Sequence, residues 1–206
     1  MSMKPILFNT EMVRAILEGR KSCTRRKIPA DIVDYCDVEA DGSLLSYENH
    51  YGDFIKPEEL CQYYPGDVLY VRETWHKYLK RVGSGENCRL QEFYGYRASI
   101  ANSEDAEEPW KPSIHMPKEA ARLFLRVTNV RVERLQDITI ENALKEGMDK
   151  YIRLNGELDE NSIITSFIGI WNSTIKKSDL DFYGWDANPY VWVIEFERCD
   201  KPESEG

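Results

Sequence analysis

The sequence has few of the residues that bind metals or form disulfides. Its five cysteines are odd in number and widely spaced, no two of them form a C-x-x-C pair, and only three histidines accompany them. A chain of 206 residues is long enough to bury a core without disulfides. We therefore expect free thiols in a reducing compartment, no metal site and no cofactor.

Long apolar segments are also absent. No run approaches the roughly 20 apolar residues of a membrane span, and the first residues lack the basic-then-apolar pattern of a signal peptide. The sequence therefore predicts a soluble cytoplasmic protein without a membrane partner.

Positive charge is scarce over most of the chain. The net charge is −9, with 27 basic and 36 acidic residues, and the pI is near 5.0. Binding a long phosphate backbone draws on many Lys and Arg contacts, so we expect no binding of bulk duplex nucleic acid. A local basic cleft in an acidic surface favours instead a small anionic or polar ligand, or a few nucleotides.

Repeats, low-complexity tracts and breaks in composition are missing as well, which predicts one domain over residues 1–198. Periodicity and turn residues predict an α+β fold. We expect insertions at about 29–64, 76–122 and 149–189, and a disordered acidic tail at 199–206.

The expected helices are one capped by Thr10 and ended by Gly19, one from Asp137 or Thr139 to Gly147, and Glu160–Ile175 with Ile164, Ile168, Trp171 and Ile175 on one face. The expected strands are Val68–Trp75, Phe93–Ala98, Leu123–Arg134 and Tyr190–Arg198.

The strongest local feature is a basic stretch over residues 18–27, directly after the first helix. A single acid, Glu18, stands against five cations, with three small thiol or hydroxyl side chains among them. The cations are Arg20, Lys21, Arg25, Arg26 and Lys27. They suit an oxygen-rich ligand, although the plainer interpretation is that Arg20 and Lys21 complement the negative end of the helix.

The order of these segments resembles the ASCH domain, a small β-barrel family related to PUA domains. The resemblance rests on a helix followed by Gly-Arg-Lys-Ser-x-Thr, a Pro-Gly-Asp turn before a strand, a Val-Arg-Val-Glu strand leading to a helix that ends Glu-Gly-Met, and a closing Val-Ile-Glu-Phe strand. The resembling segments, about half of the chain, are Lys4–Lys27, Pro65–Trp75, Leu123–Met148 and Tyr190–Glu197. Tyr70–Trp75 and Trp110–Pro117 are similar to the longer ASCH-like proteins of phages and prophages.

The resemblance implies a PUA-like barrel with flanking helices and inserted loops, and two kinds of activity. One is hydrolysis of acylated cytidine, and the other is binding or cleavage of RNA. In the acetylcytidine amidohydrolases of this family the working residues match Lys21, Thr24 and Glu146 here. Ser22 departs from the threonine that is usual in the motif, and those amidohydrolases are about half this length.

These three residue types suit amide hydrolysis. A threonine hydroxyl becomes a nucleophile when a base takes its proton, and a lysine is such a base once burial or nearby cations lower its pKa. A carboxyl such as Glu146 then delivers a proton to the departing amine. The plainer interpretations are a helix-end charge for Lys21, a strand residue for Thr24 and an exposed helix residue for Glu146.

Eight further residues are candidates for ligand binding. The tryptophans offer stacking surfaces for a base, and charged residues within strand patterns reach either solvent or a ligand. The candidates are Arg20, Arg25, Arg26, Glu73, Trp75, Arg97, Trp110 and His115. Trp110 is the best exposed candidate for stacking, whereas His115 is more typical of a packed loop residue.

We thus expect a protein that binds a nucleobase, a nucleoside or a short single-stranded RNA in a basic cleft, with amidohydrolase activity on a modified cytidine as the first hypothesis. A non-catalytic RNA-binding module and an RNA-cleaving ASCH enzyme are the alternatives. A basic groove lined with exposed aromatics would favour the module, and Lys21, Thr24 and Glu146 within a few ångströms of one another would favour the hydrolase.

Overall fold

A computed structural model describes residues 3–34, 36, 47–48, 53–99, 109–148 and 159–203. The chain forms two compact units, each assembled from segments that are distant in sequence. Unit 1 comprises Met1–Glu18, Val68–Leu125 and Arg198–Gly206, and unit 2 comprises Gly19–Asp67 and Arg126–Glu197. The prediction of a single domain with three insertions stays a prediction.

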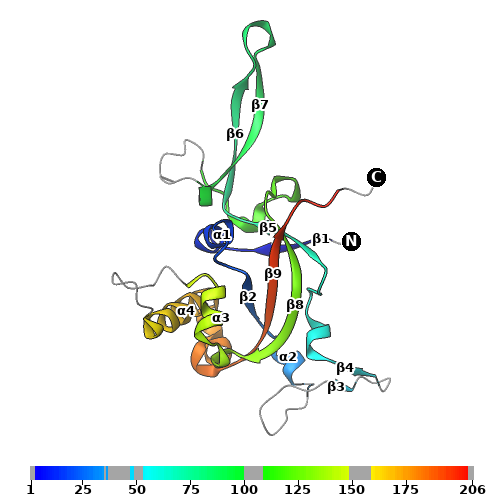
Figure 1. Cartoon of the computed structure of the whole chain (residues 1–206), viewed down its shortest axis with the longest axis vertical. Coiled ribbons are helices and arrows are strands. Elements are labelled where there is room, and N and C mark those ends of the chain that lie inside the picture. The colour runs from blue at the N-terminus through cyan, green and yellow to red at the C-terminus, as the bar shows by residue number, and fades with distance from the viewer. Residues whose placement is uncertain are drawn as a thin grey trace. The chain divides into compact units, whose positions relative to one another are not determined.

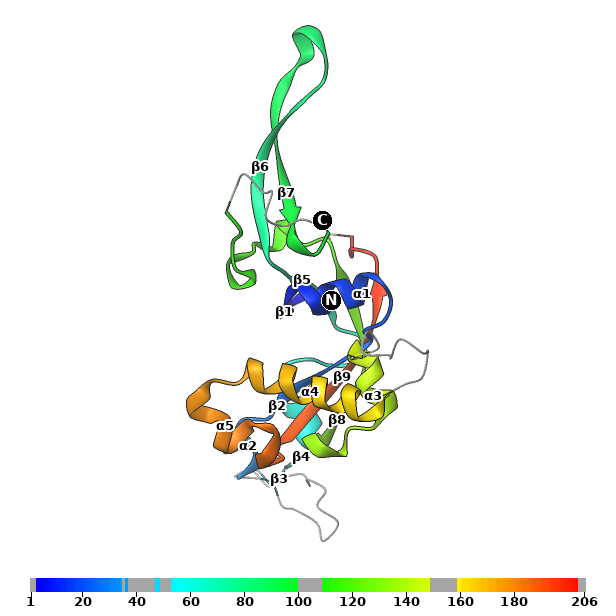
Figure 2. The same ribbon diagram turned by 90° about the vertical axis from the view of Figure 1, so that its left-hand side faces the viewer.

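The described residues of unit 1 form an α-helix, a parallel strand pair, a long hairpin and short 3₁₀ helices (Figures 1 and 2). β1 (Met3–Leu7) pairs in parallel with β5 (Val68–Arg72), in a register that joins Met3 to Val68. Between these strands in sequence comes α1 (Thr10–Leu17). The hairpin pairs β6 (Trp75–Val82) with β7 (Arg89–Tyr96), and its turn holds the short helix η2 (Gly85–Asn87). Three more short 3₁₀ helices follow, namely η3 (Arg97–Ser99), η4 (Ser113–His115) and η5 (Lys118–Ala120).

Unit 2 places helices against a set of strands in the order β8-β9-β2. β2 (Cys23–Lys27) pairs antiparallel with β9 (Tyr190–Cys199), and β8 (Phe124–Arg134) begins in unit 1 and continues in unit 2. Figure 1 shows α3 (Ile140–Lys145) and α4 (Glu160–Thr174) on the same side of these strands. The smaller elements of this unit are α2 (Ala30–Val33), β3 (Tyr47–Glu48), β4 (Phe54–Ile55), η1 (Pro57–Leu60), η6 (Leu135–Asp137), η8 (Lys177–Asp179), α5 (Leu180–Tyr183) and η9 (Trp185–Ala187).

Capping side chains begin the helices α1 and α3, and glycines end them. The cap of α1 is Asn9, one residue before the predicted Thr10, and its side chain accepts a hydrogen bond from the Met12 N–H at 2.9 Å. Thr139 caps α3 in the same way through the Asn142 N–H. Gly19 and Gly147 follow the two helices with φ of +75° and +92°, a left-handed conformation that glycine adopts without strain. The basic stretch and Glu146 therefore both lie at helix ends, as predicted.

The core of unit 2 forms where α4 packs on β9. Ile163, Phe167 and Trp171 are buried with Val191 and Val193, together with residues of the α3 region. The predicted helix is confirmed to within one residue, but its buried face is led by Ile163 and Phe167, whereas Ile164 and Ile168 are only partly buried. Trp171 belongs to both the predicted and the observed face, so the error is confined to the first two positions of the stripe, where the buried residue comes one position earlier.

The hairpin of unit 1 was not expected. Residues 76–91 fall in the expected insertion at 76–122, where Phe93–Ala98 is the expected strand, yet eight residues of β6 pair with eight of β7, from Trp75 opposite Tyr96 to Val82 opposite Arg89. The predicted strand Val68–Trp75 is divided, because β5 ends at Arg72 and β6 starts at Trp75. The outer hairpin has polar side chains on both faces, so it lacks the apolar alternation that identifies a half-buried strand.

The predicted α+β class is confirmed, since both helices and strands are present. In the described part of the chain, neither unit closes its strands into a barrel. No helix among the described residues has the length and apolar character needed to cross a bilayer. β9 extends to Cys199, the first residue of the predicted tail.

Candidate functional site

Lys21 and Glu146 meet inside unit 2. The Lys21 Nζ lies 2.6 Å from Glu146 Oε2, and the two side chains are 0 % and 5 % exposed. The backbone fixes this meeting: Lys21 and Glu146 form an antiparallel β-bridge, and the Ser22 N–H donates to the Lys145 carbonyl at 2.8 Å. Gly19 and Gly147 end the two helices just before and after the pair, so two helix ends bring these side chains together.

All three hydrogens of a Lys21 ammonium have acceptors. Besides Glu146 Oε2, Nζ donates to the Cys23 carbonyl at 2.8 Å and to the Glu146 carbonyl at 3.1 Å. A neutral amine has only two hydrogens, so this arrangement fits the charged form of Lys21. Lys21 follows a helix end, but its side chain is buried, and the plainer interpretation of Glu146 as an exposed helix residue is wrong, because Glu146 is buried too.

Glu146 is also bound by a second cation. Arg25 Nη1 lies 3.2 Å from Glu146 Oε1, and Arg25 Nη2 lies 3.0 Å from Glu133 Oε2. Arg131 continues the series, at 2.5 Å from both Glu133 Oε1 and Glu195 Oε1. Six residues of alternating charge thus form a continuous chain of ion pairs, from buried Lys21 to Glu195, which is one-third exposed. A buried charge is tolerated when it is paired in this way.

The surroundings exclude Cys23 as a nucleophile. Burial, and next the negative charge of Glu146, raise the pKa of its thiol to about 12. The thiolate is the reactive form, so Cys23 stays inert near neutral pH. In the same strand, burial lowers the pKa of the Arg26 guanidinium, while the charges of Tyr63 and Glu146 act in the opposite direction.

Thr24 is buried in the middle of β2, opposite Ile194 of β9. Successive side chains of a strand point to opposite faces. Cys23 and Arg25 contact Asn142 and Glu146 of the α3 region, so alternation directs Thr24 to the other face of β2. The structure therefore brings Lys21 and Glu146 together, and none of the hydrogen bonds among the described residues joins the Thr24 hydroxyl to either.

Three of the predicted ligand-binding residues are packed in unit 1. Glu73 is 1 % exposed and accepts two hydrogen bonds from Arg122, at 2.8 and 3.0 Å. Trp75 is buried against Met116 and Ala120, with Lys111 Nζ 5.1 Å from its ring centroid. Trp110, expected to be exposed, is half-buried with its ring centroid 4.6 Å from that of His76. Glu73 and Trp75 are therefore buried within unit 1, whereas Trp110 keeps part of its surface exposed.

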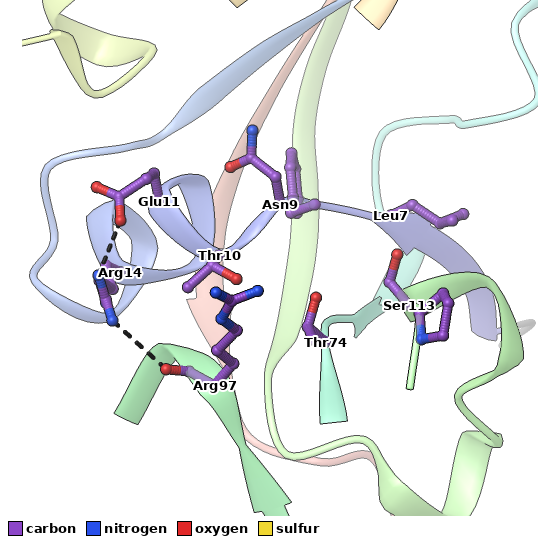
Figure 3. Close-up of a pocket in the computed structure, with 10 residues that line it drawn as sticks. Leu7, Asn9, Thr10, Glu11, Arg14, Thr74, Arg97 and Ser113 are labelled. Atoms are coloured by element: carbon purple, nitrogen blue, oxygen red, sulfur yellow. Dashed lines mark hydrogen bonds and ion pairs between the residues drawn. The ribbon is translucent and has the colours of Figure 1, made fainter. Parts of the chain in front are cut away.

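The remaining predicted residues are more accessible. Arg20, after α1, donates from Nη1 to the Gly147 carbonyl at 3.3 Å, next to the Lys21–Glu146 pair. Arg97 in η3 and His115 in η4 are both exposed. Arg97 lines a pocket of unit 1 with Thr10, Thr74 and Ser113 (Figure 3).

The part of the ion-pair chain that continues beyond Arg25 was not predicted from the sequence. Glu133, Arg131 and Glu195 alternate within strands, which is the pattern of ordinary solvent-facing positions. The signal available was the Val-Arg-Val-Glu spacing, which puts Arg131 and Glu133 on one face of β8. The pairing of Glu133 with Arg25 and of Arg131 with Glu195 depends on the β8-β9-β2 order, which no local pattern reveals.

Among the described residues, no group of three or more His, Cys, Asp or Glu side chains is arranged to hold a metal ion. Comparison of the chain with models of protein families, with curated proteins and with solved structures found no match.

Proposed function

We propose that the chain is a distant ASCH-like protein of the PUA-like group, which binds a nucleobase, a nucleoside or a short RNA, and hydrolyses an acylated cytidine. The support for the family is the order of elements, because the helix with its basic junction, the strand after Pro-Gly-Asp, the long β8 leading into α3 and the closing β9 are all present. The strands of each unit are open, in contrast to the closed small barrel of that family.

The observation that carries the proposed activity is the contact between Lys21 Nζ and Glu146 Oε2 at 2.6 Å. A proton transferred along this hydrogen bond converts the ion pair into a neutral amine and a neutral carboxylic acid. These are the base and the acid that amide hydrolysis needs, and they arise in one step.

In the proposed reaction, neutral Lys21 takes the proton of the Thr24 hydroxyl while the Thr24 oxygen attacks the acyl carbonyl. Glu146 then gives its proton to the departing cytidine amine as the C–N bond breaks. Water hydrolyses the resulting threonine ester, releasing the carboxylic acid and restoring the hydroxyl. The described arrangement counts against this step, because Thr24 faces away from the pair and β2 is paired with β9 along its whole length.

The test is incubation of the purified chain with acetylcytidine, benzoylcytidine and unmodified cytidine, with cytidine release followed by chromatography. We expect release from one or both acylated nucleosides, loss of release in Thr24→Ala and retention in Thr24→Ser. The exposed Thr128→Ala is the matched control. Absence of release from every acylated nucleoside would refute the hydrolase and favour the non-catalytic RNA-binding module.

A further inference from the structure

We propose that unit 1 contains a binding site for a phosphate monoester of nucleotide size, in the pocket between α1, η3, η4 and the segment that joins β5 to β6. The pocket has a volume of about 600 Å³, within the range of small-molecule sites. Its lining includes the guanidinium of Arg97, the hydroxyls of Thr10, Thr74 and Ser113, and the apolar side chains of Leu7 and Pro112.

The polar groups are arranged around one space. Figure 3 shows the guanidinium of Arg97 extending toward Thr10, and the hydroxyls of Thr74 and Ser113 directed into the same region. These residues come from four segments far apart in the sequence, so their convergence is a property of the folded unit. A ligand in this space meets hydrogen-bond donors from several directions.

The charges leave Arg97 as the cation offered to a ligand. Among the described residues of the lining the one acid is Glu11, which is bound by Arg14, with Arg14 Nη1 2.8 Å from Glu11 Oε1. In the part of the chain that the structure describes, no carboxylate lies within ion-pair distance of the Arg97 guanidinium. The pocket therefore favours an anion.

The pocket is also fixed by three arginines that hold its walls through backbone carbonyls or buried acids. Arg14 donates to the Ala98 carbonyl at 3.2 Å and to the Arg97 carbonyl at 3.5 Å, which holds η3 against α1. Arg122 joins buried Glu73, the neighbour of Thr74, to the Ser99 hydroxyl at 2.6 Å. Because these hydrogen bonds hold the pocket in shape before a ligand binds, binding costs little conformational entropy of the protein.

The third of these arginines supports the wall that carries Ser113. Arg72 donates from Nε to the Met116 carbonyl at 2.9 Å and from Nη2 to the Ile114 carbonyl. Both contacts hold η4 at the end of β5. Thr74 and Ser113 thus keep their separation without a ligand.

The donor set fits a phosphate monoester better than a carboxylate. A guanidinium binds two oxygens through parallel N–H groups, and three hydroxyls add three donors from other directions. A phosphate monoester has three terminal oxygens in a tetrahedral arrangement, whereas a carboxylate has two in one plane. Leu7 and Pro112 then give the sugar or base of the ligand an apolar surface.

This inference goes beyond the proposed hydrolase and does not depend on it. Every lining residue belongs to unit 1, whereas Lys21, Thr24 and Glu146 belong to unit 2. Binding is measured without turnover, so its failure and the failure of hydrolysis are separate results.

The experiment is calorimetric titration of the full chain with cytidine 5′-monophosphate, ribose 5-phosphate, cytidine and glucuronate. We expect both phosphates to bind, and cytidine and glucuronate to bind at least tenfold more weakly. Arg97→Ala should weaken binding of the nucleotide at least tenfold, Arg97→Lys should restore part of it, and Arg81→Ala, an exposed arginine of the hairpin, should leave it unchanged.

Several results would overturn the proposal. One is the absence of binding by either phosphate, and another is binding that is equal in wild type and Arg97→Ala. Equal affinity for ribose 5-phosphate and glucuronate would replace the phosphate site with a general anion site. Because the Arg97 side chain is exposed, its variants should melt at the wild-type temperature, and a Thr74→Ala variant tests the same pocket from a different segment.

Discussion

Lys21 and Glu146 are 125 residues apart in sequence and form a salt bridge of 2.6 Å in the interior of unit 2. Removing one partner of such a pair leaves a buried charge with fewer contacts, which typically costs about 3–5 kcal/mol. We expect Glu146→Gln to lower the free energy of unfolding by about that amount, because both Lys21 and Arg25 lose a charged partner. Urea denaturation measures this change.

The chain supplies a matched control for this pair. Lys145 and Glu141 form a 2.7 Å salt bridge on α3 with both side chains largely exposed. Glu141→Gln should change the unfolding free energy by only about 0.5 kcal/mol or less. Similar small losses in Glu146→Gln and Glu141→Gln would show that the Lys21–Glu146 contact is absent in solution.

The raised pKa of Cys23 predicts a loss of stability at alkaline pH. The unfolded chain loses this thiol proton near pH 9.0, whereas the folded chain keeps it to about pH 12. The folded state therefore binds more protons in this window, and the free energy of unfolding falls with rising pH by up to about 1.4 kcal/mol per pH unit from this group. Cys23→Ala should show a shallower slope between pH 9 and pH 11. Parallel slopes in the two proteins would contradict the buried thiol.

Gly95 of β7 allows its cross-strand partner in β6, His76, to be buried. A Cβ at Gly95 would lie 1.9 Å from His76 Nε2, and His76 is only 7 % exposed. Gly95→Ala should therefore destabilise the protein by about 1–3 kcal/mol, and the added change His76→Ala should reverse part of that loss. Gly169→Ala in α4 is the control, because no atom lies within 4 Å of its Cβ and alanine favours a helix by about 0.5–1 kcal/mol. A neutral Gly95→Ala would mean that His76 lies elsewhere in solution.

The basic stretch should contribute weakly to binding of single-stranded RNA. Five cations at about 0.7 each would set a log–log salt slope of roughly 3.5, but Lys21 and Arg25 are buried in ion pairs with Glu146. Of the other three cations, Lys27 is exposed and Arg20 and Arg26 are only partly accessible, so the stretch supports a slope of at most about 2. A titration across several salt concentrations measures the slope. A value well above 3.5 would reveal a second basic surface, for which Lys80, Arg81 and Arg89 of the hairpin are the exposed candidates.

The sequence predicted the elements whose signals are local. Thr139, Gly19 and Gly147 mark helix ends by capping and backbone chemistry, and β8 and β9 are recognisable from their long apolar alternation. The β6–β7 hairpin was missed, because its exposed outer half carries no buried face to impose a period. The register of the hairpin is set by the pairing of β6 with β7, which the pattern of either strand alone does not reveal.

The sequence predicted that Lys21 and Glu146 belong to the candidate site, but not that these residues are buried and paired with other charges. The resemblance brought Lys21 and Glu146 together, and the structure joins them at 2.6 Å. Burial of Lys21 follows from the bridge between two helix ends, and pairing of Arg25 with Glu133 follows from the strand order, so neither is visible in the basic stretch itself. Trp75 is buried in the same way, because the element that covers it comes from residues 116–120.

The most direct test of the proposed activity is the rate of acetylcytidine hydrolysis by Lys21→Arg, compared with Lys145→Arg on the exposed face of α3. An arginine keeps the positive charge and the ion pair with Glu146, but it does not give up a proton to become a base. We therefore predict that Lys21→Arg melts close to the wild-type temperature but hydrolyses acetylcytidine at least a hundredfold more slowly. Lys145→Arg should hydrolyse it at the wild-type rate. Hydrolysis by Lys21→Arg at the wild-type rate would contradict the account, because Lys21 would then serve the structure and not the reaction.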